Sequence, residues 1–405
     1  MHEIFAYSNP VIEKVKLDFK RYLFDKINWN SRLIEILGAR GVGKTTLMLQ
    51  KANLLNKEVP NQAVYISLDD QLMFTHSIVE LSESLEQYGV KYLFLDEVHK
   101  YPPKQKGYDW SAEIKNAYDR YPGLNIVYSG SSVLKVYKGH GDLSRRKSPY
   151  RLSGLSFREY LELSGIAKFQ AFQLNDLLAG HQETSGRITQ DFKIIPHFKA
   201  YLKTGYYPFY KEDPASYSSR LMNILNVIIE TDIPAVSYIS FETALKLKKL
   251  LAAIASTAPY VPNLLKLRQE LLIADQRTLL KYLDFLEKAE VLTALTQETK
   301  GNKIMQKPEK IYINNPNYSY SLHKGVEEVG TIRETFFQSQ LGVEHEITLP
   351  SKGDFLVDGK YTFEIGGRSK TATQIRDLPD AYLGLDDIEN GVLNRIPLWM
   401  FGFLY

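Results

Sequence analysis

Cysteine is absent from this 405-residue sequence. Its absence excludes disulfide bonds, cysteine nucleophiles, and zinc or iron–sulfur sites with cysteine ligands. No run of about eighteen apolar residues occurs, which is the length a membrane-spanning helix needs. The N-terminal segment MHEIFAYSNP also lacks the basic and then apolar pattern of a secretion signal. We therefore expect a cytoplasmic protein without a membrane partner.

A strong excess of one charge is also missing, since the formal net charge is only +3. The field of the whole chain therefore gives little attraction for nucleic acid or anionic lipid, and any such binding requires a local patch. Hydrophobic residues make up 44% and charged residues 24%, as in ordinary folded proteins. A chain of this length exceeds one compact core, so several domains are expected.

Short β-prone runs alternate with helical patterns in the first part of the chain. Strands are predicted at residues 32–37, 62–68, 91–95 and 125–128, with a helix after Thr45. This alternation predicts a parallel sheet with helices on both faces. An amphipathic entry helix is predicted before it, over residues 11–27, from the spacing of Val15, Phe19 and Leu23.

The pattern changes after about Leu155. Helices are predicted at residues 157–163, 192–202 and 219–229, and further helical stretches lie between Phe241 and Leu292. Strand candidates return at 310–314, 353–358, 361–367 and 396–405. This order predicts a helical region followed by a small C-terminal α/β domain.

The segment GARGVGKT at residues 38–45 fits the P-loop pattern, in which backbone N–H groups surround phosphate oxygens at the start of a helix. Lys44 is predicted to neutralise the β- and γ-phosphates of ATP, and the Thr45 hydroxyl to bind Mg²⁺. The predicted ATP-binding residues are Gly38, Ala39, Arg40, Gly41, Val42, Gly43, Lys44, Thr45 and Thr46. The fold class that follows is α/β, with the parallel sheet of a P-loop NTPase.

Two acids follow the predicted strand at 91–95, as in a Walker B pattern. Asp96 would lie beside the phosphate loop and hold Mg²⁺, while Glu97 would accept a proton from the attacking water. The next strand ends in Ser129-Gly130-Ser131-Ser132, where Ser131 is our candidate for sensing the γ-phosphate or the water. An ordinary turn explains these serines equally well.

Residues 33–163 resemble the AAA+ superfamily, and more narrowly the bacterial and archaeal ATPases with a winged-helix segment and a restriction-endonuclease-like C-terminal domain. The resemblance rests on GARGVGKTT, YLFLDEVHK, YSGSS and GDLSRRKSPYRLSGLSFREYL. In the last motif it implies an arginine finger that acts on the ATP of a neighbouring subunit. Arg145 and Arg146 both fit, with Arg145 slightly favoured, and a solvated basic turn is the alternative. The finger implies a homo-oligomer.

The resemblance extends to the second half of the chain. Residues 275–292 resemble the family's winged helix, where packing is favoured over reading DNA. The C-terminal part resembles the nuclease-like fold, with Glu334, Asp354 and Glu364 as potential metal ligands, but Gly366 replaces the expected lysine. Lys370, with Gln374 nearby, is a substitute, although loss of nuclease activity is the simpler interpretation. The implied domains are 1–165 (ATPase core), 166–235 (helical lid), 236–300 (winged-helix-like) and 301–405 (nuclease-like).

Three functions are compatible with these features. The leading hypothesis is an ATP-hydrolysing conformational switch or remodeller of an unknown protein partner. The alternative is an ATP-controlled protein that binds or cuts DNA. A module that holds ATP without turnover is the third, and Glu97 argues against it, because simple binding needs no water-activating acid.

Overall fold

The computed structural model describes residues 1–102, 109–136, 141–237, 239–257, 259–297, 307–323 and 329–405. The chain forms two compact units. The first contains Met1–Ser153 and a short segment that begins at Ala235, and the second contains Gly154–Pro234 and Ile239–Tyr405. The division of the chain into four domains stays a prediction.

The first unit is built on a parallel sheet in the order β2-β3-β4-β1-β5. Its strands are β1 (Leu33–Gly38), β2 (Ala63–Ser67), β3 (Tyr92–Asp96), β4 (Asn125–Ser131) and β5 (Ser148–Arg151). The first four confirm the predicted strands. The sequence did not predict β5, which carries Pro149 and lies at the edge of the sheet, where a residue without an N–H is tolerated.

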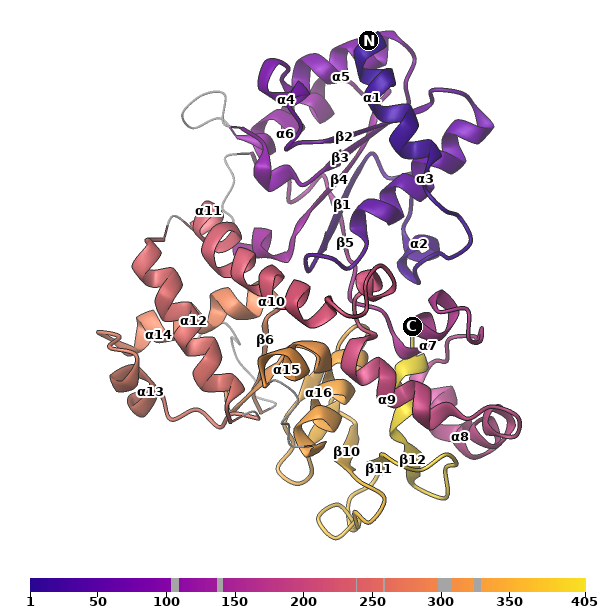
Figure 1. The fold of residues 1–405 in the computed structure, drawn as a ribbon, viewed down its shortest axis with the longest axis vertical. Helices are drawn as coiled ribbons and strands as arrows, with labels where there is room; N and C mark the ends of the chain where they lie inside the picture. The colour runs from indigo at the N-terminus through magenta and orange to yellow at the C-terminus, as the bar shows by residue number, and fades with distance from the viewer. Residues whose placement is uncertain (103–108, 137–140, 238, 258, 298–306, 324–328) are drawn as a thin grey trace. The chain divides into compact units, whose positions relative to one another are not determined.

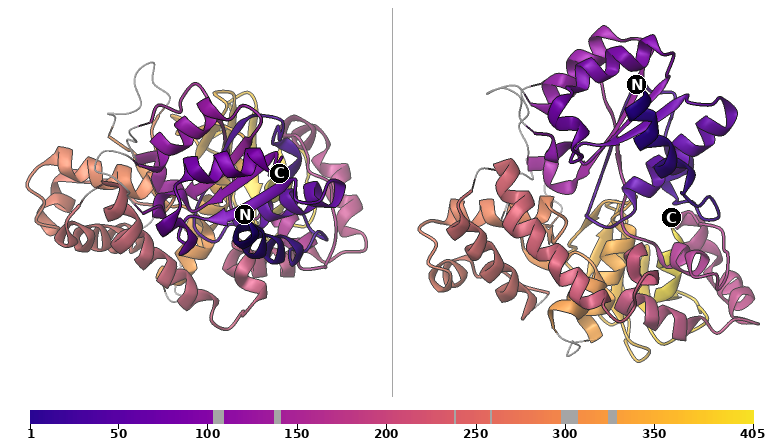
Figure 2. Two further views of the ribbon diagram at one scale, coloured as in Figure 1. Left: turned by 90° about the horizontal axis from the view of Figure 1, so that it is seen from above. Right: turned by 45° about the horizontal axis from the view of Figure 1, so that its top comes forward.

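Helices cover both faces of this sheet, as predicted (Figures 1 and 2). Figure 1 shows α1 and α3 on one face and α5 and α6 on the other. The helices are α1 (His2–Glu13), α2 (Leu23–Lys26), α3 (Lys44–Glu58), α4 (Leu72–Thr75), α5 (Ile78–Gln87) and α6 (Trp110–Arg120), with the short turns η1 (Val98–Lys100) and η2 (Ser132–Val136). Ser77 and Glu80 form a reciprocal capping box that begins α5, and Asp109 caps α6.

The predicted entry helix over residues 11–27 is wrong. Helix α1 ends at Glu13, and the chain is irregular until α2 begins at Leu23. Tertiary hydrogen bonds override the helical periodicity here, because the Gln50 side chain donates to the backbone oxygens of Lys16 and Phe19 at 2.9 and 2.7 Å. These carbonyls are thereby held against α3 in an irregular conformation.

The second unit begins with helices and ends with a sheet. In chain order, its elements and the junction helix α11 are α7 (Phe157–Leu163), α8 (Leu174–Thr189), α9 (Ile194–Thr204), η3 (Pro208–Lys211), α10 (Tyr217–Val227), η4 (Ile228–Asp232), α11 (Ile233–Ser237), α12 (Phe241–Ala255), α13 (Leu264–Glu270), α14 (Gln276–Lys288), β6 (Leu292–Leu295), β7 (Lys310–Ile313), α15 (Pro316–Leu322) and α16 (Val329–Leu341). Strands β6 and β7 form an antiparallel pair. None of the described helices is long and apolar enough to cross a membrane.

A small C-terminal sheet has the order β12-β11-β10-β9-β8. Its strands are β8 (Ile347–Thr348), β9 (Phe355–Val357), β10 (Tyr361–Gly366), β11 (Ala381–Leu385) and β12 (Arg395–Pro397). The strand predicted at 396–405 is mostly wrong, because the 3₁₀ helix η6 (Leu398–Phe403) follows Pro397. All six residues of η6 are buried, and an apolar run buried on every side shows no periodicity that separates helix from strand.

Candidate nucleotide site

The phosphate loop connects β1 to α3. Gly41 and Gly43 have φ angles of 86° and 99°, which side chains rarely adopt, so glycine is required at both turns of the loop. Gly38 lies so close to the backbone that a Cβ atom there would be 2.3 Å from the Leu152 oxygen. The loop ends at the first turn of α3, where backbone N–H groups lack acceptors within the helix and form a site for anions.

Lys44 extends across this loop rather than into solvent. Its side chain is buried, and its Nζ atom donates to the oxygens of Gly38 and Ala39 at 3.0 Å each. The ammonium group is therefore held against the backbone at the start of the loop. Thr46, the last residue predicted to bind ATP, is exposed in the first turn of α3.

Asp96, at the end of β3, accepts hydrogen bonds at both of its carboxylate oxygens. Oδ2 accepts from the hydroxyls of Thr45 at 2.5 Å and Tyr65 at 2.9 Å. Oδ1 accepts from the Ser129 hydroxyl and from the Glu97 backbone N–H, the latter at 3.0 Å. Asp96 thus joins the phosphate loop to three neighbouring strands of the sheet.

The side-chain oxygens of Thr45 and Asp96 are of the kind that a magnesium ion prefers as ligands. Hydroxyl and carboxylate oxygens are hard donors, and Mg²⁺ usually takes only one or two protein ligands beside phosphates and water. Within the described ranges, no group of three or more histidine, aspartate or glutamate side chains is placed to hold a metal. A cation at Thr45 and Asp96 would therefore take most of its ligands from nucleotide and water.

Glu97 is held in an unusual backbone conformation and in a positive field. Its φ and ψ angles are 54° and 45°, in the left-handed region. Its Oε2 atom lies 3.4 Å from His99 Nε2 and 3.5 Å from Lys100 Nζ. Burial alone would raise the pKa of Glu97, but the charges of Lys44, His99, Lys100 and Arg40 outweigh it and hold the pKa below its ordinary value. The carboxylate is therefore ionised near neutral pH.

Lys100 connects Glu97 to the turn after β2. Its Nζ atom is 2.9 Å from Asp69 Oδ2, and Asp69 Oδ1 accepts from the Ser67 hydroxyl at 2.5 Å. Burial lowers the pKa of Lys100, yet the neighbouring carboxylates of Asp69 and Glu97 raise it overall. Lys100 is therefore a bridge between two acids.

The segment that carries this geometry also matches a known family. Residues 30–161 match the family described as an AAA domain. Over these residues the chain is therefore similar to an AAA domain. This match supports the predicted AAA+ resemblance for that segment, while the winged-helix and nuclease-like assignments stay predictions.

Individual proteins that are similar to this chain have low sequence identity to it. An uncharacterized protein of Methanocaldococcus jannaschii is 29% identical over 326 residues, which cover 76% of this chain and 66% of the relative. The Walker-type ATPase of Pyrococcus abyssi is 16% identical, with a TM-score of 0.43 over 75% of this chain and 96% of that one. DnaA from Aquifex aeolicus with AMPPCP bound is 15% identical, with a TM-score of 0.27 over 71% and 88%. Both TM-scores lie below 0.5, so neither likeness bears on function.

Two side chains that bind Asp96 were not assigned from the sequence. Tyr65 lies in β2, where nothing local marks it, and Ser129 is one of several serines at the end of β4. Ser131, the predicted sensor, is buried beside Gly38 in the β1–β4 register, and its hydroxyl oxygen is 3.5 Å from the Val133 N–H. The structure thus places Ser129 rather than Ser131 against Asp96, and the sensing role of Ser131 stays a prediction.

The two candidate finger arginines differ in their surroundings. Arg146 donates through Nε and Nη2 to both carboxylate oxygens of Asp119, at 3.0 and 3.2 Å, and through Nη1 to the Asp142 oxygen at 3.1 Å. Arg145 is exposed. Arg146 therefore has an intramolecular role already, which favours Arg145 as the residue able to reach another subunit.

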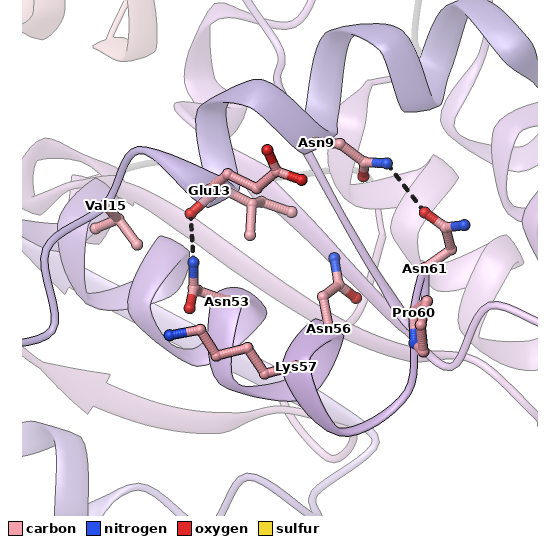
Figure 3. Close-up of a pocket in the computed structure, with 9 residues that line it drawn as sticks. Asn9, Glu13, Val15, Asn53, Asn56, Lys57, Pro60 and Asn61 are labelled. Atoms are coloured by element: carbon pink, nitrogen blue, oxygen red, sulfur yellow. Dashed lines mark hydrogen bonds between the residues drawn. The ribbon is translucent and has the colours of Figure 1, made fainter.

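A pocket of about 380 Å³ lies between α1 and the last turns of α3, away from Lys44. Figure 3 shows the Asn9 amide directed toward Asn61, with which it forms a 3.0 Å hydrogen bond. Asn56 binds both backbone groups of Ala63 and so fixes the start of β2. None of the predicted site residues lines this pocket, and its amides serve the fold of the first unit.

Proposed function

We propose that this chain binds and hydrolyses ATP with Mg²⁺ and works as a conformational switch or remodeller. The observation that supports it is the joint placement of Thr45, Asp96 and Glu97 at the end of the phosphate loop. A protein that only held nucleotide would not need an ionised acid next to the magnesium ligand.

Each residue has a distinct part in this proposal. Lys44 and the N–H groups of the loop bind and orient the phosphates, and Thr45 and Asp96 hold Mg²⁺. The ion, when bound, supplies charge neutralisation across the β- and γ-phosphates. Glu97 accepts the proton of the attacking water, a role for which its low pKa keeps it ionised.

Arg145 completes the site in trans under this proposal, which implies a homo-oligomer. A cation from a neighbouring subunit stabilises charge that develops during transfer and makes hydrolysis depend on assembly. The switch can be tested by small-angle scattering of the full chain with Mg²⁺ and either ATPγS or ADP. Different curves are expected, while identical curves would contradict switching. Capture with the Glu97→Gln variant from the native host would identify the protein partner.

A second candidate, ATP-controlled binding or cleavage of DNA, is favoured by one observation in the C-terminal sheet. Gly366 stands where a nuclease would carry lysine, but a Cβ atom at Gly366 would be 2.6 Å from the Lys370 side chain. Lys370 therefore fills this space, and its Nζ atom is 2.7 Å from the buried Glu364. This places a lysine beside one of the predicted acids.

The other two acids are engaged by protein groups. Glu334 accepts from the Tyr312 hydroxyl, and Asp354 from the Ile365 N–H, both at 2.7 Å. Burial first and then the charge of Asp354 raise the pKa of Glu334. The Asp354→Ala and Glu364→Ala double variant should keep ATPase activity if this domain has no essential metal chemistry. Magnesium-dependent DNA cleavage by the wild type that this variant loses would establish the second candidate.

A further inference from the structure

Arg21 is an almost fully buried arginine in the irregular segment between α1 and α2, with only 5% of its surface exposed. A guanidinium group is seldom buried unless its donors are satisfied. Its Nη1 atom donates to the Val42 oxygen at 2.5 Å, and its Nη2 atom donates to the Ser153 oxygen at 2.7 Å. Bonds of this kind from a charged donor are strong and directional.

The first of these acceptors belongs to the phosphate loop. Val42 lies between Gly41 and Gly43, the two loop residues with positive φ. In a trans peptide the C=O and N–H groups point in opposite directions. Because Arg21 holds the Val42 oxygen, the N–H of Gly43 must point away from Arg21, and this orients one of the loop's donors.

The second acceptor, Ser153, is the last residue of the N-terminal part of the first compact unit, and Gly154 begins the second unit. The chain here is tied to the loop in another way as well. The Leu152 N–H donates to the Leu37 oxygen at 2.8 Å, and the Leu152 oxygen makes the close approach to Gly38. Residues 152 and 153 therefore pass directly against the start of the phosphate loop.

The segment that carries Arg21 is itself held in place by hydrogen bonds to helix α3. Gln50, which is 3% exposed in α3, holds the oxygens of Lys16 and Phe19 just before Arg21. The same helix begins at Lys44. A change in the loop therefore cannot be absorbed by free movement of the segment that carries Arg21.

We propose that Arg21 is a positioning residue that couples nucleotide binding at the phosphate loop to the chain crossing at Ser153 and Gly154. The inference rests on the proposed function, because it requires that the loop bind nucleotide. When bound phosphates hold the loop in one conformation, they also hold the Val42 carbonyl in place. The Arg21 guanidinium, which binds both the Val42 and the Ser153 oxygens, then restrains Ser153 as well.

The test is amide hydrogen exchange of the full chain over residues 152–155, with and without saturating Mg²⁺ and ATPγS. Exchange in the wild type should slow by about fivefold, the change that one hydrogen bond of ordinary strength contributes. Arg21→Lys keeps the charge but lacks the fork that reaches both oxygens. This variant should bind nucleotide with lower affinity. Nucleotide should no longer slow its amide exchange over residues 152–155.

Arg32→Lys is the matched control. Arg32 also donates to a backbone oxygen, that of Tyr118 at 2.7 Å, and its Nη2 atom bonds to Tyr118 and Tyr121 rather than to the phosphate loop. This variant should keep the protection. Arg21→Gln serves if the lysine variant does not fold. In steady state, Arg21→Lys should raise the KM for ATP by about tenfold and change kcat far less, whereas general damage would lower kcat.

The outcomes separate the two proposals. Equal protection in the wild type and Arg21→Lys at saturating nucleotide would overturn the role of Arg21. Nucleotide binding by the wild type without any change at residues 152–155 would overturn the coupling alone. A wild type that does not bind nucleotide would overturn the proposed function and this inference together.

Discussion

The Thr45 hydroxyl donates a hydrogen bond of 2.5 Å to Asp96 across a separation of 51 residues in the chain. The bond joins the start of α3 to the end of β3, so the phosphate loop and the acidic strand end form one site. Magnesium would bind at these two oxygens, which makes their approach the geometric basis of the proposed activity.

Lys44→Ala should weaken ATP binding by about 100-fold or more, the effect of losing roughly 3 kcal/mol from a charge-assisted contact. The backbone cradle that remains cannot offset the phosphate charge. Titration with a fluorescent ATP analogue measures the affinity, and Lys57→Ala, an exposed lysine in the last turn of the same helix, is the control. Unchanged affinity in Lys44→Ala would remove the phosphate loop from nucleotide binding.

Tyr65→Phe should lower kcat by about three- to tenfold, because Asp96 loses a hydrogen bond worth about 1 kcal/mol. Burial and the Asp96 charge raise the pKa of Tyr65, so its hydroxyl donates at every working pH. ATP affinity should change little. Tyr128→Phe is a matched control, since Tyr128 is also buried in the sheet and donates at 2.9 Å to another carboxylate, Glu35. Equal losses in both variants would indicate damage to the sheet instead.

Lys100→Ala should reduce kcat by several fold without a comparable rise in KM, because Glu97 loses a neighbour that orients it. Lys100→Arg should recover much of the activity. Lys115→Ala removes a lysine that pairs with Asp119 at 3.3 Å on the surface and should have no effect. A Lys100→Ala enzyme with normal steady-state constants would show that the contact with Glu97 is incidental.

Arg145→Ala should lower turnover by roughly 10³-fold with little change in affinity, as expected for a finger that acts on the transition state. Arg146→Ala should have a much smaller effect, because Arg146 is engaged with Asp119 in its own chain. Mixing Arg145→Ala subunits with Lys44→Ala subunits should restore part of the activity, since each supplies what the other lacks. A mixture that stays inactive where the wild type assembles would exclude action in trans.

The local motifs could be predicted from the sequence because their chemistry is carried by neighbouring residues. A strand, glycine turns and Lys44 follow one another directly, and Asp96 ends an apolar strand. The strands β1 to β4 were therefore predicted close to their observed bounds, and so was the start of helix α3. The joint placement of Lys44, Thr45, Asp96 and Glu97 follows from the parallel sheet that these elements form.

The remaining contacts depend on tertiary structure and left no local signal. Tyr65 reaches Asp96 only because β2 pairs with β3 in a register that places Ser67 beside Asp96. Arg21 lies in a segment whose periodicity predicted a helix, and its partners Val42 and Ser153 are remote in the sequence. The pairing of Lys100 with Asp69 and that of Arg146 with Asp119 also join residues far apart in the sequence.

The most direct test of the account is phosphate release from ATP by the wild type and by Glu97→Gln, with nucleotide binding measured on the same preparations. The amide keeps the shape of the side chain but cannot accept the proton of water. The account predicts magnesium-dependent release by the wild type, and a variant that binds ATP normally but releases no phosphate above background. Hydrolysis by Glu97→Gln at the wild-type rate, or a wild type that binds ATP without hydrolysing it, would contradict the account.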